Sequence, residues 1–203
     1  ELIALNNVEI IAQVQADSAL LEKLFELCRQ VQEPPSRRNG FLFLRELFEI
    51  AKPLSMPHQM AFFRSLSQHG LFSILEKAVD SDDPAIVSAC TDIMLCTLNH
   101  EASLLRGYLI EESGKGLLSN LIHGLLHFHD AGLKAQVTEI LRCLLDASSM
   151  EQSPERDRFL ELFYSQHMDT LLSPFLDTDT WGPDGSYLPD ANKAQAEGGA
   201  SEG

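Results

Sequence analysis

DDPAIVSACTDIMLCTLNH, residues Asp82 to His100, contains the clearest helix signal in this 203-residue chain. Asp83 is a favourable N-cap, and Pro84 stands at the first helical position, where its missing N–H is not needed. Asn99 is a residue type that often ends a helix, so we predict a helix from Asp83 to Asn99. Apolar side chains recur within it at helical spacing and predict one wide buried face: Ile86, Ala89, Cys90, Ile93 and Met94.

A similar pattern occurs again 47 residues later, from Asp130, in DAGLKAQVTEILRCLL. The alignment matches the two N-cap aspartates and pairs Thr91 with Thr138. A weaker third copy, RRNGFLFLRELFEIAK, lies about 46 residues upstream of the first. A period of this length is typical of HEAT or armadillo repeats, in which stacked helix pairs bury a continuous core.

The rest of the chain also favours helices over strands. Apolar residues recur at helical spacing between short turns and predict about eleven helices, the first beginning near Val8; alternating β-branched patterns are missing. The helix after Asn99 is predicted to begin at Glu101, and the last helix is predicted to end at Leu172, before Pro174. The predicted fold class is all-α, a HEAT/armadillo-like helical repeat solenoid.

Residues 1–176 form the predicted helical domain, and residues 177–203 a separate tail. The tail is acidic and rich in Gly, Pro and Ala, with Trp181, Tyr187 and Leu188 as its bulky apolar residues. So few apolar groups cannot offset the entropy cost of ordering the chain, which predicts disorder. The alternative is that these three residues dock as a short linear motif.

Composition disfavours several classes of function. A net charge of −15 disfavours binding of a phosphate backbone through bulk charge, and no apolar run reaches the roughly 20 residues of a membrane span. The four cysteines form no ligand pattern and lie on apolar helix faces, which predicts buried, reduced thiols in an intracellular protein: Cys28, Cys90, Cys96 and Cys143.

The sequence shows no recognisable catalytic apparatus. His123 and His127 lie four residues apart on one helix face, a spacing that can hold zinc, but no glutamate follows the first histidine as in metalloproteases. Asp130 is interpreted as a helix cap. Because nucleophile, phosphate-loop and calcium-loop patterns are also missing, we predict no catalytic residue, cofactor or metal site.

Four segments carry a more specific pattern. They are FFR at residues 62–64, GLF at residues 70–72, the helix with TDI at residues 91–93, and FLELFYSQHMDTLLSPFL at residues 159–176. In this order they resemble the SMK-1 domain of protein phosphatase 4 regulatory subunit 3. The resemblance covers about residues 6–176 and suggests a fragment of that domain.

The resemblance implies a non-catalytic regulatory or scaffold subunit of a phosphatase 4 complex. The implied partners are a phosphatase catalytic subunit, a second regulatory subunit and phosphoprotein substrates such as DNA-damage proteins, in the nucleus and cytoplasm. Neither nucleic acid nor membrane is an implied partner. The family's N-terminal EVH1-type domain, which selects substrates, falls outside this chain.

The family pattern also keeps polar residues on otherwise apolar helices. These residues are the candidate partner contacts, each with an internal hydrogen bond or ion pair as its alternative role: Arg64, Asp92, Arg106, Glu112, Tyr164 and His167. The aromatic residues of the pattern are expected in the core: Phe62, Phe63, Phe159 and Phe163.

Two other functions stay open at this point. One is a generic α-solenoid adaptor for protein–protein interaction, unrelated to phosphatases, which shares the predicted fold. The other is a metal-dependent enzyme that uses His123, His127 and Asp130 as ligands. Binding of a phosphatase catalytic subunit separates the first from the leading hypothesis, and a metal assay tests the second.

Overall fold

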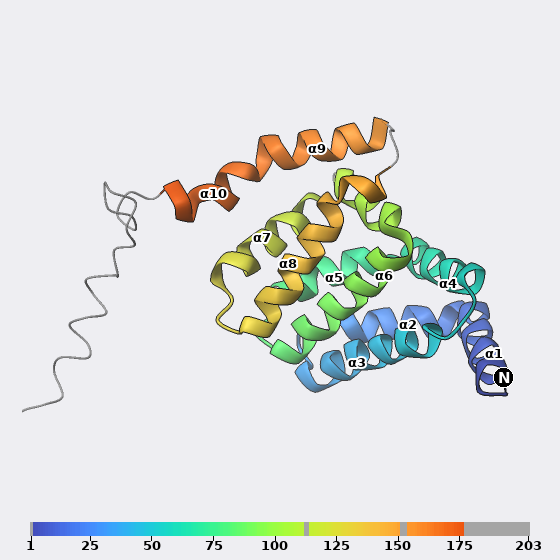
Figure 1. The fold of residues 1–203 in the computed structure, drawn as a ribbon. Helices are drawn as coiled ribbons and strands as arrows, with labels where there is room; N and C mark the ends of the chain where they lie inside the picture. Colours follow the sequence, from blue (N-terminus) through green and yellow to red (C-terminus); the bar gives the residue numbers. More distant parts are fainter. Residues whose placement is uncertain (1, 112–113, 151–153, 177–203) are drawn as a thin grey trace, which may run out of the picture. The chain divides into compact units, whose positions relative to one another are not determined.

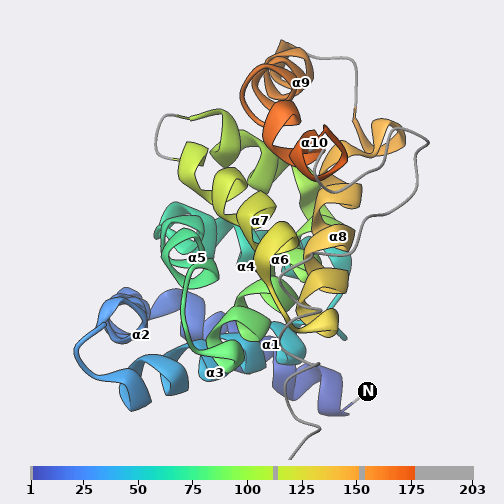
Figure 2. The same ribbon diagram turned by 90° about the vertical axis from the view of Figure 1, so that its left-hand side faces the viewer.

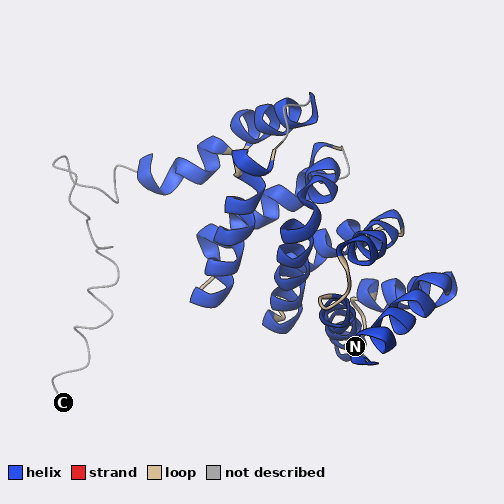
Figure 3. Ribbon diagram, turned by 45° about the vertical axis from the view of Figure 1, so that its right-hand side comes forward, coloured by secondary structure: helices blue, strands red, loops and turns tan. Residues whose placement is uncertain are grey.

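A computed structural model describes residues 2–111, 114–150 and 154–176. Within these ranges every regular element is a helix, as Figure 3 shows, which confirms the all-α prediction. A short 3₁₀ helix covers Ala147–Ser149, and the described residues contain ten α-helices: α1 (Leu2–Ala16), α2 (Ser18–Arg29), α3 (Pro34–Ala51), α4 (Met56–Gln68), α5 (Leu71–Val79), α6 (Pro84–Ile110), α7 (Lys115–His127), α8 (Ala131–Leu145), α9 (Pro154–Gln166) and α10 (Met168–Leu176).

Local sequence explains where several helices begin. The side chains of Asp17, Asp83 and Asp130 each accept a hydrogen bond of 2.8–3.0 Å from a backbone N–H in the first turn of α2, α6 and α8. Prolines occupy the first turn of α3, α4 and α6, where they are tolerated. Gly70 precedes α5 with φ 94°, a backbone conformation that glycine adopts without strain.

Two helices that were predicted as separate neighbours are one element. α6 runs through the predicted end at Asn99, but Glu101 within it has non-helical backbone angles, φ −151° and ψ 74°. The predicted break is therefore present as an interruption of α6. This joining explains why the described residues contain ten α-helices and not about eleven.

The predicted end of the last helix is wrong, because α10 continues through Pro174 to Leu176. Proline has no N–H, so Pro174 leaves the carbonyl of Thr170 without its regular helical partner. The Ser173 hydroxyl donates to that carbonyl at 2.8 Å and replaces the missing hydrogen bond. α1 also begins earlier than predicted, at Leu2.

The chain divides into two compact units, Glu1–Leu162 and Phe163–Gly203, with the boundary inside α9. In the first unit, α3, α6 and α8 pack as one layer, and α2, α5 and α7 follow one another in a second layer (Figure 1 and Figure 2). α1 packs on α2, α3 and α4. The three aligned sequence copies are thus neighbours in one layer, as stacked repeats require. The predicted tail, residues 177–203, lies outside the described residues.

The core contains the aromatic residues expected there. Phe48 and Phe63 stack with ring centroids 5.1 Å apart. Burial raises the pKa of the Cys28 thiol to about 12, so this thiol is protonated at neutral pH. Among the described residues, no helix is both long and apolar enough to cross a membrane. The predicted core aromatics are all buried, and all cysteines but the last are buried: Phe62, Phe63, Phe159, Phe163, Cys28, Cys90 and Cys96.

Candidate functional site

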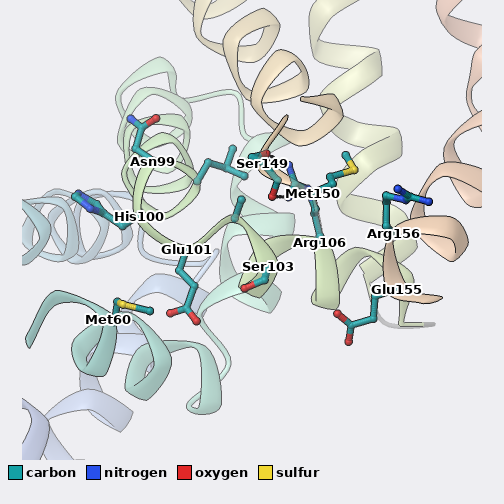
Figure 4. A pocket seen from close by; sticks show the side chains of 12 residues that line it. Met60, Asn99, His100, Glu101, Ser103, Arg106, Ser149, Met150, Glu155 and Arg156 are labelled. Carbon is teal, nitrogen blue, oxygen red and sulfur yellow. Dashed lines mark hydrogen bonds between the residues drawn. The ribbon is translucent and has the colours of Figure 1, made fainter. Parts of the chain in front are cut away.

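The interruption of α6 lies at a cleft of about 570 Å³ in the first unit, shown in Figure 4. Residues 98–103 of α6 line its centre. A single residue with non-helical backbone angles interrupts the regular i→i−4 hydrogen bonding of a helix at that point. The remaining lining residues come from α4, the second half of α6, the end of the 3₁₀ helix with the residue after it, and the start of α9: Met60, Arg106, Ser149, Met150, Glu155 and Arg156.

Arg64 of α4 holds the interrupted segment from one side. Its Nε atom donates to both carboxylate oxygens of Glu101, at 2.9 and 3.1 Å, and its Nη2 atom donates to Oε1 as well. The Arg64 side chain is 54% exposed, whereas the Glu101 side chain is only 10% exposed. This bidentate pair therefore neutralises an acid that would otherwise be buried alone.

Arg106 holds α6 from the other side of the cleft. It is 9% exposed and donates to the carbonyls of Leu144 at 3.0 Å, Cys143 at 2.8 Å and Ser149 at 3.1 Å, and to the Ser149 hydroxyl at 2.6 Å. The first two carbonyls end α8, where regular helical donors run out. Arg106 thus fixes the end of α8 to the second half of α6, and burial lowers the pKa of its guanidinium.

Asp92 belongs to a second group, which we call the polar line: Arg45 on α3, Thr91 and Asp92 on α6, and Gln136 on α8. Arg45 Nη1 lies 3.6 Å from Asp92 Oδ2, and Gln136 Nε2 donates to Asp92 Oδ1 at 2.7 Å. The Thr91 hydroxyl donates to Gln136 Oε1 at 2.7 Å. Burial raises the pKa of the Asp92 carboxyl, although Arg45 acts in the opposite direction. The polar line crosses all three helices of one layer.

Two further predicted contact residues, Tyr164 and His167, belong neither to the cleft lining nor to the polar line. Tyr164 is 59% exposed and meets Phe163 edge to face, with ring centroids 5.8 Å apart. His167 is buried, its Nε2 atom has no hydrogen-bond partner among the described residues, and burial lowers its pKa. Glu112 lies outside the described residues. Both Tyr164 and His167 belong to the second unit.

Sequence reasoning selected Arg64, Asp92 and Arg106 but missed their partners. Glu101 is 37 residues from Arg64, and Ser149 is 43 residues from Arg106. A polar residue in an apolar helix signals that some partner exists, because buried polar groups are hydrogen-bonded. It does not identify that partner, which depends on how distant helices pack.

The histidines considered as metal ligands do not form a larger cluster. The rings of His123 and His127 lie 4.3 Å apart between centroids. Asp130, the third residue of that hypothesis, accepts from the Leu133 N–H at 2.8 Å as the cap of α8. In the parts of the chain that the structure describes, no three His, Cys, Asp or Glu residues come together as a metal site needs.

Stacked helix pairs in two layers, joined by side-chain hydrogen bonds between neighbouring repeats, define an α-solenoid, a class of protein that typically offers extended binding surfaces. Within this class the family can be named. A family model described as Phosphatase 4 regulatory subunit 3 matches residues 1–191, and the chain belongs to that family. This match confirms the resemblance that the spaced segments indicated.

Three curated proteins are similar to this chain over most of its length. Suppressor of Mek1 from Dictyostelium discoideum is 36% identical over 176 residues, which cover 85% of this chain and 16% of that protein. Protein PPP4R3C1 from Mus musculus is 27% identical, covering 86% and 23%. Serine/threonine-protein phosphatase 4 regulatory subunit 3 from Drosophila melanogaster is 26% identical, covering 84% and 18%. The chain thus spans less than a quarter of these relatives, and no solved structure matches it.

Proposed function

We propose that this chain is the helical-repeat part of a non-catalytic regulatory subunit of a protein phosphatase 4 complex. The family match over residues 1–191 carries the proposal. The relative from Drosophila melanogaster is named as such a regulatory subunit, and its similarity extends over 84% of this chain. In this proposal the partner phosphatase performs the dephosphorylation, and the solenoid supplies binding surface.

The proposed partners are the catalytic subunit and a second regulatory subunit. The complex would then act on phosphoproteins, including nuclear proteins of the DNA-damage response. Among the predicted contact residues, Arg64 and Tyr164 are accessible to a partner, and Asp92 is partly so. Arg106 is engaged internally, so its proposed contribution to partner binding is indirect.

The test is retention of the phosphatase 4 catalytic subunit on the immobilised 203-residue chain, with the type 2A catalytic subunit as comparison. Selective retention of the first supports the proposal. Tyr164→Ala should weaken retention, because exposed aromatic residues often dominate binding energy at interfaces. Phe43→Ala on α3 is the matched control, since Phe43 is also an exposed aromatic residue. Retention of neither phosphatase would contradict the proposal that this part of the subunit binds the catalytic subunit.

A further inference from the structure

The cleft lies where the backbone of α6 departs from helical angles, at Glu101. The N–H groups that follow Glu101 and the C=O groups that precede it belong to residues that line the cleft. Extended peptides are often recognised through such groups, because every residue of a peptide carries one donor and one acceptor. The main chain of a peptide is therefore a suitable partner for any donor or acceptor that the interruption at Glu101 leaves without its helical hydrogen bond.

Most charges around the cleft are already compensated within the protein. Glu101 is paired with Arg64, and the guanidinium of Arg106 donates to main-chain carbonyls and a hydroxyl. Arg156 donates to Asp157 at 2.7 Å. A phosphate group would thus find its cationic neighbours engaged, in a chain whose net charge is −15.

One charged residue of the lining is different. Glu155 is exposed at the start of α9 and makes no ion pair or hydrogen bond with another described residue. Half-buried methionines also line the cleft, Met60 on α4 and Met150 after the 3₁₀ helix; Figure 4 shows them on either side of the interrupted segment. Methionine side chains adapt to apolar groups of varied shape.

We propose that this cleft binds a short extended segment of a partner protein. An apolar side chain of the segment lies between Met60 and Met150, its main chain pairs with the interrupted part of α6, and a nearby lysine or arginine pairs with Glu155. The argument rests on the geometry and charge of the cleft alone. It therefore goes beyond the proposed regulatory role and is tested separately from it.

The probe is a capped nonapeptide with a central leucine and a lysine two residues to either side, in a glycine–serine background. The chain contains five methionines, so methyl-labelled methionine gives five NMR signals. The Met60 and Met150 signals are expected to shift saturably during titration, while Met56, Met94 and Met168 serve as internal references. A peptide with glutamate in place of lysine should bind about two- to fivefold more weakly, the range for an exposed ion pair.

Two pairs of variants test the location. Ser103→Tyr, at an exposed position within the cleft, should abolish the saturable shifts, and Ser119→Tyr at an exposed position of α7 should not. Glu155→Lys should reverse the preference between the lysine and glutamate peptides, whereas Glu161→Lys on the same helix should preserve it. Circular dichroism checks the fold of each variant.

Three results would overturn the proposal. The first is no saturable shift of Met60 or Met150 with the lysine peptide. The second is binding that Ser103→Tyr and Glu155→Lys leave unchanged. The third is tighter binding of a peptide whose central leucine is replaced by phosphoserine, which would make the cleft an anion site.

Discussion

Arg106 makes the most extensive internal contacts of the candidate residues. Arg106→Met keeps most of the side-chain volume but removes four donated hydrogen bonds and leaves carbonyls at the end of α8 without a partner. Leaving buried acceptors unpaired is costly, so we expect the free energy of unfolding to fall by about 2–4 kcal/mol. Urea unfolding followed by circular dichroism measures this change.

Arg142→Met on α8 is the matched control for Arg106. Arg142 is exposed and pairs with Glu139 one turn away on the same helix. Pairs of this kind contribute little to stability, so this variant should unfold almost like the natural protein. Equal losses in the two variants would mean that Arg106 does not have the structural role that its contacts indicate.

Asp92 should make the protein less stable as pH rises from acidic values toward neutrality, the opposite of what most acidic residues do. Burial raises the pKa of its carboxyl in the folded state. An acid of this kind supports the fold at pH values below its unfolded pKa, and the support is lost as pH rises through the folded pKa. Asp92→Asn removes this loss, so the variant should gain stability relative to the natural protein between about pH 4 and pH 7.

Asp83 provides a control of opposite sign for this prediction. A hydrogen bond from Arg38 lowers the pKa of the Asp83 carboxyl, so its contribution is present at neutral pH and lost on acidification. Asp83→Asn should therefore cost more stability at pH 7 than at a pH well below 3.8, the ordinary pKa of an aspartate. Thermal unfolding at several pH values tests both variants. If the stability difference from the natural protein changes with pH in the same direction for both variants, the opposite pKa shifts of Asp92 and Asp83 are contradicted.

At the scale of the helices, local signals predicted starts better than ends. Asp83 and Asp130 begin α6 and α8 because an N-cap needs only its own next turn. Pro174 was a poor guide to the end of α10, because Ser173 satisfies the carbonyl that proline leaves unpaired. The interruption at Glu101 was predictable from the sequence near Asn99, but its pairing with Arg64 was not, since it depends on the packing of α4 against α6.

The Arg64–Glu101 pair should hold the interrupted segment of α6 in place without supporting the whole fold. Arg64→Met leaves the Glu101 carboxylate without its cation, so amide hydrogen exchange in residues 98–104 should become faster. The overall melting temperature should change little, because Arg64 is mostly exposed. Hydrogen-exchange mass spectrometry reports on this segment directly.

Arg38→Met is the control for Arg64, since Arg38 is an exposed arginine that pairs with Asp83 at 2.6 Å at the start of α6. In Arg38→Met, amide hydrogen exchange should become faster in the first turn of α6 and not at residues 98–104. The assignment fails if exchange at the interruption is the same in Arg64→Met as in the natural protein.

At the scale of the whole first unit, the layered packing determines how far a local defect spreads. In a solenoid each repeat contacts only its neighbours, so stability is a sum of repeat and interface contributions. α6 packs against α3, α4, α5, α7 and α8, whereas the main partners of α8 are α6 and α7. A cavity in α6 therefore weakens several interfaces at once, and a cavity in α8 weakens mainly its interfaces with α6 and α7.

Ile93 of α6 and Leu144 of α8 are both fully buried, so they allow this difference to be measured. Either residue changed to alanine should cost about 2–5 kcal/mol of local packing. Leu144→Ala should speed hydrogen exchange in α8 and in its partners α6 and α7 while α2 and α3 keep their protection. Ile93→Ala should speed exchange in α3, α5 and α8 together, because all three pack on α6. If Leu144→Ala opens α2 and α3 as much as α8, the unit unfolds as one cooperative block and not as stacked repeats.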